Sequence, residues 1–394
     1  MDRNTITGLV LIGLILTVFS IINRPTEDDI KKRQNELAKK EQVKKDLKKD
    51  PKPDTLKRDA LTEKSDVNEE PKKESELASK AETTTPIIKK QVIIKETDKF
   101  IIHFTNIGGQ IEALYLKEYK SYNDYKSNKN NALCLFEKGD QNTSFSFYDG
   151  DTRVNTAKWA FDTVNSKANE ISFSYEYNNK GKVVQTYKLK NGSYNIDYKV
   201  EFVNLDNISK DNIQMNWKTS FLQTEKLLSE QARVSTICFN EKEEGFDYLS
   251  ETSDDDSDIE NDITWIAYKQ SYFSSIIQPQ QAFNKNKSKM TVKTYAEGHR
   301  RENTHIKDFE SVLSLNLDQN SNNTISFKWF FGPNDYEVLE AANPEYTEIL
   351  NFGWGLFRWI NIYAVQPIFN FLLETGLSIG ISHRLPGVCW SSFV

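Results

Sequence analysis

The sequence has little cysteine and little histidine, and this scarcity excludes several kinds of site. Its 394 residues include three cysteines, Cys134, Cys238 and Cys389, which are too few and too scattered for a disulfide scaffold or a zinc site. The four histidines form no HxxxH or HExxH pattern. A GxSxG motif, a phosphate-binding P-loop and a GxGxxG motif are also missing. We therefore expect no enzyme, no catalytic residue, no metal and no cofactor.

A large excess of charge of one sign is absent as well. The formal net charge is -6 and the sequence pI is about 5.5, which argues against a nucleic-acid partner. A mean hydropathy of -0.64 excludes a chain that is embedded in a membrane throughout. With 38% hydrophobic and 27% charged residues, the chain is not disordered throughout either. These averages conceal segments of very different composition.

Long apolar runs are rare, and the clearest one lies near the start of the chain. Ile6 to Ile22 is uncharged and, as a helix, would be roughly 25 Å long, which is short but sufficient for a membrane span. No small-residue cleavage site and no lipoprotein cysteine follow it. We therefore predict a single uncleaved membrane anchor helix at residues 1–23. The flanking charges do not decide its orientation.

Residues 24–89 lack almost everything that a folded core requires. No aromatic residue occurs between Phe19 and Phe100, and no glycine occurs between Gly13 and Gly108. About half of the residues are charged, so this stretch cannot bury enough apolar surface to offset chain entropy. We predict a disordered charged linker. Two interpretations of this linker remain. It is a solvated spacer, or its paired lysines contact anionic lipid.

Alternation of apolar and polar residues begins near Val92 and dominates the next 240 residues or so. Phe100–Phe104, Tyr194–Phe202 and Ile325–Trp329 all show the period of two that is typical of half-buried strands. No repeating βαβ rhythm is present, so we predict a mainly β fold, a large antiparallel sandwich over residues 90–340. Asn191-Gly192 predicts a tight two-residue hairpin turn within it.

The sequence of this domain offers no convincing candidate for a catalytic or metal-binding site. Asp254–Asp258 lacks the glycine and the glutamate of an EF-hand calcium loop, so we interpret it as a solvated acidic loop. Glu297–Glu302 is interpreted as a charged surface turn, and His103 as a packed strand residue. The aromatic residues fit a core better than a sugar-stacking surface. Cys134 and Cys238 could form a disulfide if the domain lies outside the cytoplasm, and the sequence does not decide this.

The region 341–376 is amphipathic and rich in aromatic residues. Its apolar side and single arginine suit the headgroup boundary of a bilayer. A helix packed against the sandwich would show the same pattern, so this alternative stays open. The residues that we expect at the membrane interface are Phe352, Trp354, Phe357, Arg358 and Trp359.

Residues 377–394 begin like a second membrane span and then stop being apolar. Leu377–Ile381 opens the span, whereas Ser382–Gly387 brings charge, proline and glycine. We interpret this segment as a truncated start of a span followed by an aberrant tail.

The order of these segments resembles the YidC family of membrane protein insertases, especially its Bacteroidetes members, from Met1 to about Ile381. Four short motifs carry the resemblance: Asn106–Ile111 with its following strand, Trp265–Ser275, Phe331–Pro333, and Phe352–Asn370. Each is weak alone, but their order behind an anchor is specific.

The resemblance implies a β-super-sandwich in the periplasm, attached to the cell inner membrane. It also implies a role in the insertion and folding of integral membrane proteins, alone or with the Sec translocon. The partners would be nascent integral membrane proteins, the Sec translocon and the lipid bilayer. Because the resemblance ceases after Ile381, where the family's substrate groove would begin, we interpret the sequence as truncated or frameshifted and expect it to be inactive by itself.

Two alternatives stay open. One is an anchored periplasmic β-sandwich module that binds carbohydrate or protein. The other is a mutarotase-like enzyme, for which the sequence shows no paired carboxylate and histidine at suitable spacing.

Overall fold

The computed structural model describes residues 89–177, 181–205, 208–317, 323–350, 352, 359–365 and 367–368. All of them belong to one compact unit that spans residues 84–394. The predicted anchor at 1–23, nearly all of the predicted linker at 24–89 and the predicted tail at 377–394 lie outside the described residues. Among the described residues, no helix is both long and apolar enough to cross a membrane.

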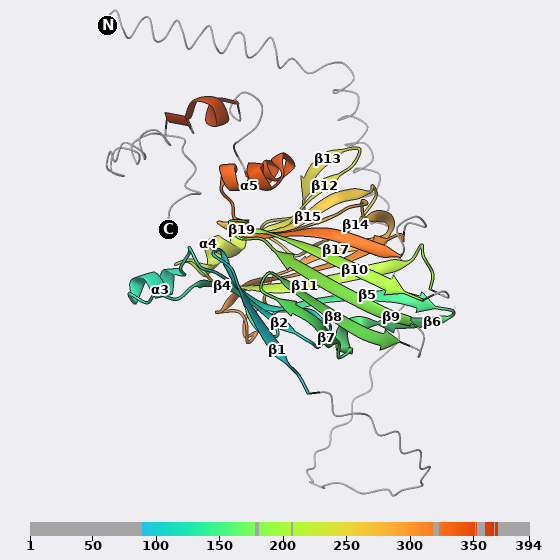
Figure 1. Cartoon of the computed structure of the whole chain (residues 1–394). Coiled ribbons are helices and arrows are strands. Elements are labelled where there is room, and N and C mark those ends of the chain that lie inside the picture. The colour runs from blue at the N-terminus through green and yellow to red at the C-terminus, as the bar shows by residue number, and fades with distance from the viewer. Residues whose placement is uncertain are drawn as a thin grey trace, which may run out of the picture. The chain divides into compact units, whose positions relative to one another are not determined.

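The described chain is mainly β, as predicted, and its strands form three antiparallel sheets (Figure 1). The four-stranded sheet has the order β1 (Val92–Glu96), β2 (Phe100–Thr105), β3 (Gln110–Leu116) and β4 (Leu133–Phe136). The nine-stranded sheet has the order β13 (Gly245–Tyr248), β12 (Thr236–Glu241), β15 (Ile263–Lys269), β16 (Phe273–Pro279), β19 (Thr324–Pro333), β10 (Asn195–Val203), β9 (Gly181–Leu189), β8 (Glu170–Tyr177) and β7 (Asp162–Lys167). The six-stranded sheet has the order β14 (Asp255–Asp258), β17 (Asn284–Lys293), β18 (His305–Leu315), β11 (Ile213–Leu222), β5 (Gln141–Asp149) and β6 (Thr152–Asn155).

Aromatic side chains join the nine-stranded and six-stranded sheets face to face. Phe145 of β5 lies 6.3 Å from Tyr198 of β10, measured between ring centroids. Trp217 of β11 meets Trp329 of β19 edge-on at 4.8 Å. All four side chains are almost fully buried, and each such burial contributes about 1.5–3 kcal/mol. The alternating pattern in the sequence therefore produces a sandwich core, which confirms the predicted fold class.

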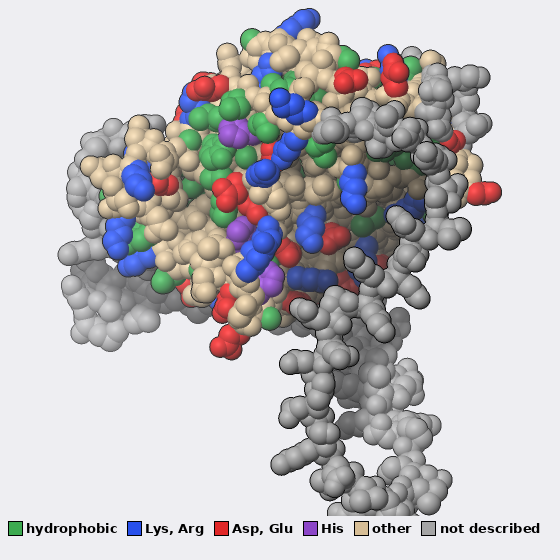
Figure 2. Space-filling view, turned by 90° about the horizontal axis from the view of Figure 1, so that it is seen from below, with side chains coloured by type: hydrophobic (Ala, Val, Ile, Leu, Met, Phe, Trp, Pro, Cys, Tyr) green, Lys and Arg blue, Asp and Glu red, His purple; other side chains and the backbone are tan. Residues whose placement is uncertain are grey.

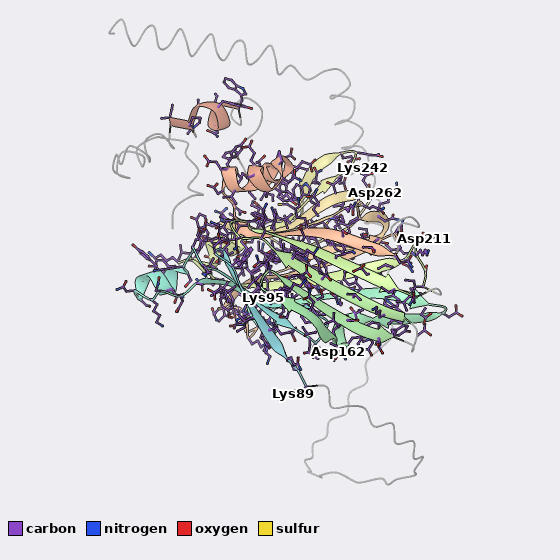
Figure 3. The ribbon with its side chains drawn as sticks, viewed as in Figure 1. Lys89, Lys95, Asp162, Asp211, Lys242 and Asp262 are labelled. Carbon is purple, nitrogen blue, oxygen red and sulfur yellow. The ribbon has the colours of Figure 1, made fainter. Side chains whose placement is uncertain are left out.

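The four-stranded sheet packs against the nine-stranded sheet by ring contacts and one polar contact. Phe104 of β2 lies 5.0 Å from Tyr187 of β9. Lys95 of β1, labelled in Figure 3, donates its ammonium group to the carbonyl oxygen of Lys167 at the end of β7. One face of this sheet is thus part of the core, and its opposite face is left for other contacts.

The predicted two-residue hairpin turn at Asn191-Gly192 is wrong. The register of β9 and β10 begins only at Leu189 and Ile196, so the loop is longer. The Gly192 amide donates to the Asp98 carboxylate at 2.8 Å. Tyr194 turns inward and donates its hydroxyl to Glu118 at 2.5 Å. These contacts with distant residues hold an open loop where the local sequence favours a tight turn.

The prediction of a loop at Asp254–Asp258 is also wrong in part. Residues Asp255–Asp258 form the edge strand β14, which pairs with the lysine-rich strand β17. Lys289 of β17 approaches the Asp256 carboxylate to 2.6 Å. The positive charges of the neighbouring strand therefore allow consecutive aspartates to enter a sheet. The strand itself remains at the domain surface, because alternate residues are exposed.

Short helices complete the fold. They are η1 (Thr156–Lys158), α3 (Tyr122–Lys126), α4 (Leu228–Arg233), α5 (Tyr336–Ala342), η2 (Pro344–Ile349) and the single turn η3 (Asn361–Val365). The last strand, β19, ends at Pro333, inside the predicted range 90–340, and Asp335 caps the start of α5 by accepting from the Val338 amide. The last elements of the domain thus lead directly into the C-terminal segment.

Candidate membrane-interface site

The helical residues after the sandwich are fixed to the nine-stranded sheet. Tyr346 of η2 is fully buried, and its hydroxyl donates to Gln278 of β16 at 2.9 Å. Trp265 of β15 donates its indole N–H to the Glu345 carboxylate at 3.0 Å. Residues 341–350, which we assigned to the interfacial region, therefore pack as part of the domain.

Phe352 is the described link between this packed region and the chain beyond. It is half-buried against the core and meets the Tyr336 ring edge-on at 5.8 Å. Its carbonyl oxygen accepts from the Asn361 side chain at 2.9 Å. The alternative of packing against the sandwich therefore applies to this residue.

The described part of segment 359–368 has a different character, because four of its large apolar side chains face solvent. Trp359 is 59% exposed and Tyr363 is 67% exposed, and their rings lie 5.6 Å apart. Ile360 and Ile368 add exposures of 36% and 55%. Among the described residues, these four make up four of the ten exposed large hydrophobic side chains. Tryptophan and tyrosine favour the boundary between water and lipid, so this segment is the best candidate for membrane contact.

The predicted interface residues are described only in part. Phe352 and Trp359 are within the described residues, with Trp359 exposed and Phe352 packed. Trp354, Phe357 and Arg358 lie outside them. Tyr363, four residues after Trp359, is also exposed but is not among the predicted interface residues. The assignment of these residues to a membrane interface remains a prediction.

Charge on the domain surface is mixed rather than collected in one patch on the face that Figure 2 shows. Several exposed lysines of the domain pair with carboxylates, for example Lys117 with Glu96 at 2.7 Å and Lys218 with Glu310 at 3.6 Å. Attraction to anionic lipid requires unpaired basic residues near the surface. We therefore base the candidate site on the aromatic segment and not on electrostatics.

A polar cluster beside β18 was missed by the sequence analysis. Arg301 was interpreted as part of a surface turn, yet its guanidinium reaches the nearly buried Asp140 carboxylate at 2.8 Å. His305 also approaches the same carboxylate oxygen, with its Nε2 at 3.1 Å. Asp140 lies 161 residues before Arg301 in the sequence, so no local motif reveals the cluster.

The second half of this cluster surrounds Asp308. Burial favours its neutral form, but hydrogen bonds from Ser220 and Tyr295 outweigh this and lower the pKa of the Asp308 carboxyl group. Burial and the bond to Asp308 raise the pKa of Tyr295 to about 12. The charged groups of the cluster pair with one another and tie three segments of the domain together. We assign it a structural role.

Two of the three cysteines, Cys134 and Cys238, lie within the described domain. Cys134 and Cys238 are both free thiols, so the disulfide that the sequence left open is not formed. Burial raises the pKa of each thiol to about 12, which keeps both protonated at neutral pH. Within the described ranges, no group of three or more His, Cys, Asp or Glu side chains could hold a metal ion.

Comparison with known proteins identifies relatives of the chain. A family model described as the YidC periplasmic domain matches residues 93–370. The membrane protein insertase YidC of Bacteroides fragilis is 27% identical over 395 residues, which cover 97% of this chain and 60% of the relative. That of Phocaeicola vulgatus is 24% identical over 398 residues, with the same two coverages. The chain thus spans about 60% of the length of the curated relatives it matches.

Solved structures also resemble the chain, though distantly. A putative aldose 1-epimerase from Escherichia coli K12 has a TM-score of 0.38 and 8% identity, and the match covers 62% of this chain and 100% of that one. A GalM/aldose epimerase homologue from C. elegans has a TM-score of 0.39 and 9% identity, with coverages of 62% and 99%. The match to the periplasmic-domain model includes nearly all of the described sandwich and the segment after it. The chain therefore belongs to the YidC family of membrane protein insertases.

Proposed function

We propose that this chain takes part in the insertion and folding of integral membrane proteins at the cell inner membrane. Its sandwich would lie in the periplasm, and residues 359–368 would lie at the membrane surface. The observation that carries the proposal is the match of residues 93–370 to the YidC periplasmic domain. The exposed aromatic segment at the end of the same match supports it.

The mechanism is one of positioning rather than of covalent chemistry. The contacts of Trp265 and Tyr346 fix the end of the sandwich, so the segment that follows starts from a defined place. Burial of Trp359 and Tyr363 among lipid headgroups removes apolar surface from water, and complete burial of one such side chain contributes about 1.5–3 kcal/mol. The domain would thereby be held beside the bilayer where nascent segments arrive.

The proposed partners are nascent integral membrane proteins, the Sec translocon and the lipid bilayer. Polar segments of a substrate enter a bilayer at high cost unless protein groups shelter them. We assign the described domain the placement of the insertion site at the membrane, which the exposed segment 359–368 supports.

Site-specific photocrosslinking tests this proposal directly. Benzoylphenylalanine replaces Trp359 in one variant and Val164 of β7, which is equally exposed at 60%, in a control. We expect light-dependent adducts from position 359 with lipid and with ribosome-bound nascent membrane proteins, and none from position 164. Equal labelling from both positions, or adducts with soluble nascent chains only, would contradict the proposal.

A further inference from the structure

The free face of the four-stranded sheet carries a groove that the proposed insertion role does not use. Its volume is about 610 Å³, within the range of about 300–1,000 Å³ that is typical of small-molecule sites. The floor comes from β2, β3 and β4, and the walls come from the loop around α3 and from the end of β11. The floor residues are Ile101, His103, Tyr115 and Cys134. The wall residues are Ser121, Asp124, Asn130, Asn131, Ala132, Leu222 and Gln223.

Two half-buried rings dominate the floor of the groove. The His103 and Tyr115 rings lie 5.3 Å apart at an angle of 52°. Burial, followed by the neighbouring Cys134, raises the pKa of Tyr115 to about 12, so its hydroxyl stays neutral. Among the described residues, the His103 nitrogens have no hydrogen-bond partner. The floor thus offers apolar ring surface next to an imidazole that can still donate or accept.

The walls supply uncharged hydrogen-bonding groups beside one carboxylate, Asp124, and no cation. Asp124 already accepts from the Ser121 hydroxyl at 2.6 Å and from the Asn131 amide at 2.8 Å. These hydrogen bonds lower the pKa of Asp124. Gln223 donates to the carbonyl oxygen of Glu225 at 2.8 Å, which leaves its own side-chain oxygen to accept. Asn130 contributes an exposed amide at the rim.

These features select against several classes of ligand. A phosphate or a carboxylate would find no lysine or arginine among the lining residues. An extended peptide is held chiefly by backbone hydrogen bonds, but the floor backbone is already paired, Ile101 with Tyr115 and Tyr115 with Cys134. Only side chains remain to bind a ligand. A sugar fits this chemistry, because the apolar face of its ring packs on aromatic rings and its hydroxyls pair with amides and imidazole.

We propose that this groove binds a short neutral oligosaccharide. Tyr115 and His103 form the surface on which a sugar ring packs, and Asn130 and Gln223 pair with its hydroxyls. None of the lining residues belongs to segment 359–368, so the proposal does not depend on the role in membrane insertion.

Titration of the full chain with three neutral trisaccharides, maltotriose, cellotriose and triacetylchitotriose, tests the proposal. The readout is the NMR signal of the His103 ring. At least one sugar is expected to shift this signal with saturation. Tyr115→Ala is expected to weaken that binding at least tenfold, and Asn130→Ala, at an exposed position where folding is not at risk, at least threefold. Tyr248→Ala removes an exposed tyrosine of β13 that does not line the groove, and is expected to change nothing.

Near-ultraviolet circular dichroism checks that each variant keeps the wild-type fold. No saturable shift with any of the three sugars overturns the proposal. Binding that is equal in wild type and in the folded Asn130→Ala and Tyr115→Ala variants overturns it as well. A neutral peptide of alternating serine and alanine that shifts the His103 signal where the sugars do not would identify a peptide site instead.

Discussion

Lys307 shows how one residue can couple the fold to pH. It is 1% exposed, and its ammonium donates to the carbonyl oxygens of Ser235 at 2.8 Å and Glu251 at 2.6 Å. Burial lowers its pKa from 10.5 to about 8, although the charges of Glu251 and Asp254 oppose this shift. Lys307 lies two residues before Phe309 in β18, so both side chains are on the buried face of the strand. The folded domain therefore holds a costly cation below about pH 8.

The Lys307→Met variant is expected to change the pH dependence of stability. Between about pH 8 and pH 10.5 the unfolded chain binds the proton more strongly than the folded one, so the contribution of Lys307 to stability rises with pH in this window. Relative to the variant, wild type should gain up to about 1.4 kcal/mol per pH unit there. Thermal unfolding of both proteins from neutral to alkaline pH measures this difference.

A matched variant controls for the loss of one positive charge in this experiment. Lys242→Met removes a lysine at an exposed position next to β12, labelled in Figure 3. Cysteine and tyrosine groups also titrate at alkaline pH, but they are common to all the proteins compared, so they cancel in the differences. Parallel stability curves for wild type and Lys307→Met would contradict the pH role of Lys307.

At the scale of elements, the sequence predicted strands well where burial repeats every second residue. Strand β10 follows that pattern throughout, and β19 follows it from Thr324 to Trp329. The sequence did not predict the open loop before β10, because its contacts with Asp98 and Glu118 override the local preference for a tight turn. The sequence predicted Trp359 as an interface residue because it is an aromatic residue in an amphipathic segment. The sequence did not predict the groove, because its lining residues are spread between positions 101 and 223 and share no local pattern.

Strand β19 lies between β16 and β10, and one of its residues has no room for a side chain. A Cβ added at Gly332 would lie 2.7 Å from Phe330 Cζ and 3.0 Å from Tyr194 Cγ. Gly332→Ala should therefore lower the free energy of unfolding by about 1–3 kcal/mol through overpacking. Denaturant titration measures the loss.

The same clash predicts how the loss can be relieved. In a Phe330→Leu background the nearer of the two contacting rings is gone and only the Tyr194 ring remains, so adding the alanine at position 332 should cost less than in wild type. Gly332→Ala with wild-type stability, or an equal cost in both backgrounds, would show that the strand accommodates the methyl group by moving.

The described domain combines a sandwich with the exposed apolar segment 359–368. The sequence adds a predicted anchor at residues 1–23. If both contact the same bilayer, the first attachment raises the effective concentration of the second, so a modest affinity of segment 359–368 suffices.

This arrangement predicts different results in the presence and in the absence of the anchor. A chain without residues 1–23 should still bind lipid vesicles, and Trp359→Ser with Tyr363→Ser should weaken that binding about tenfold or more, since partial burial of two such side chains contributes at least about 1.4 kcal/mol. Raising the salt concentration should have little effect, because the contact is apolar. Vesicle flotation measures both effects, and Val164→Ser with Tyr248→Ser is the control for losing exposed apolar side chains elsewhere.

With residues 1–23 present, the double serine variant should remain on the vesicles, because the predicted anchor has more apolar surface than segment 359–368. Strong salt sensitivity, or equal loss of binding in the control, would place the membrane contact outside segment 359–368.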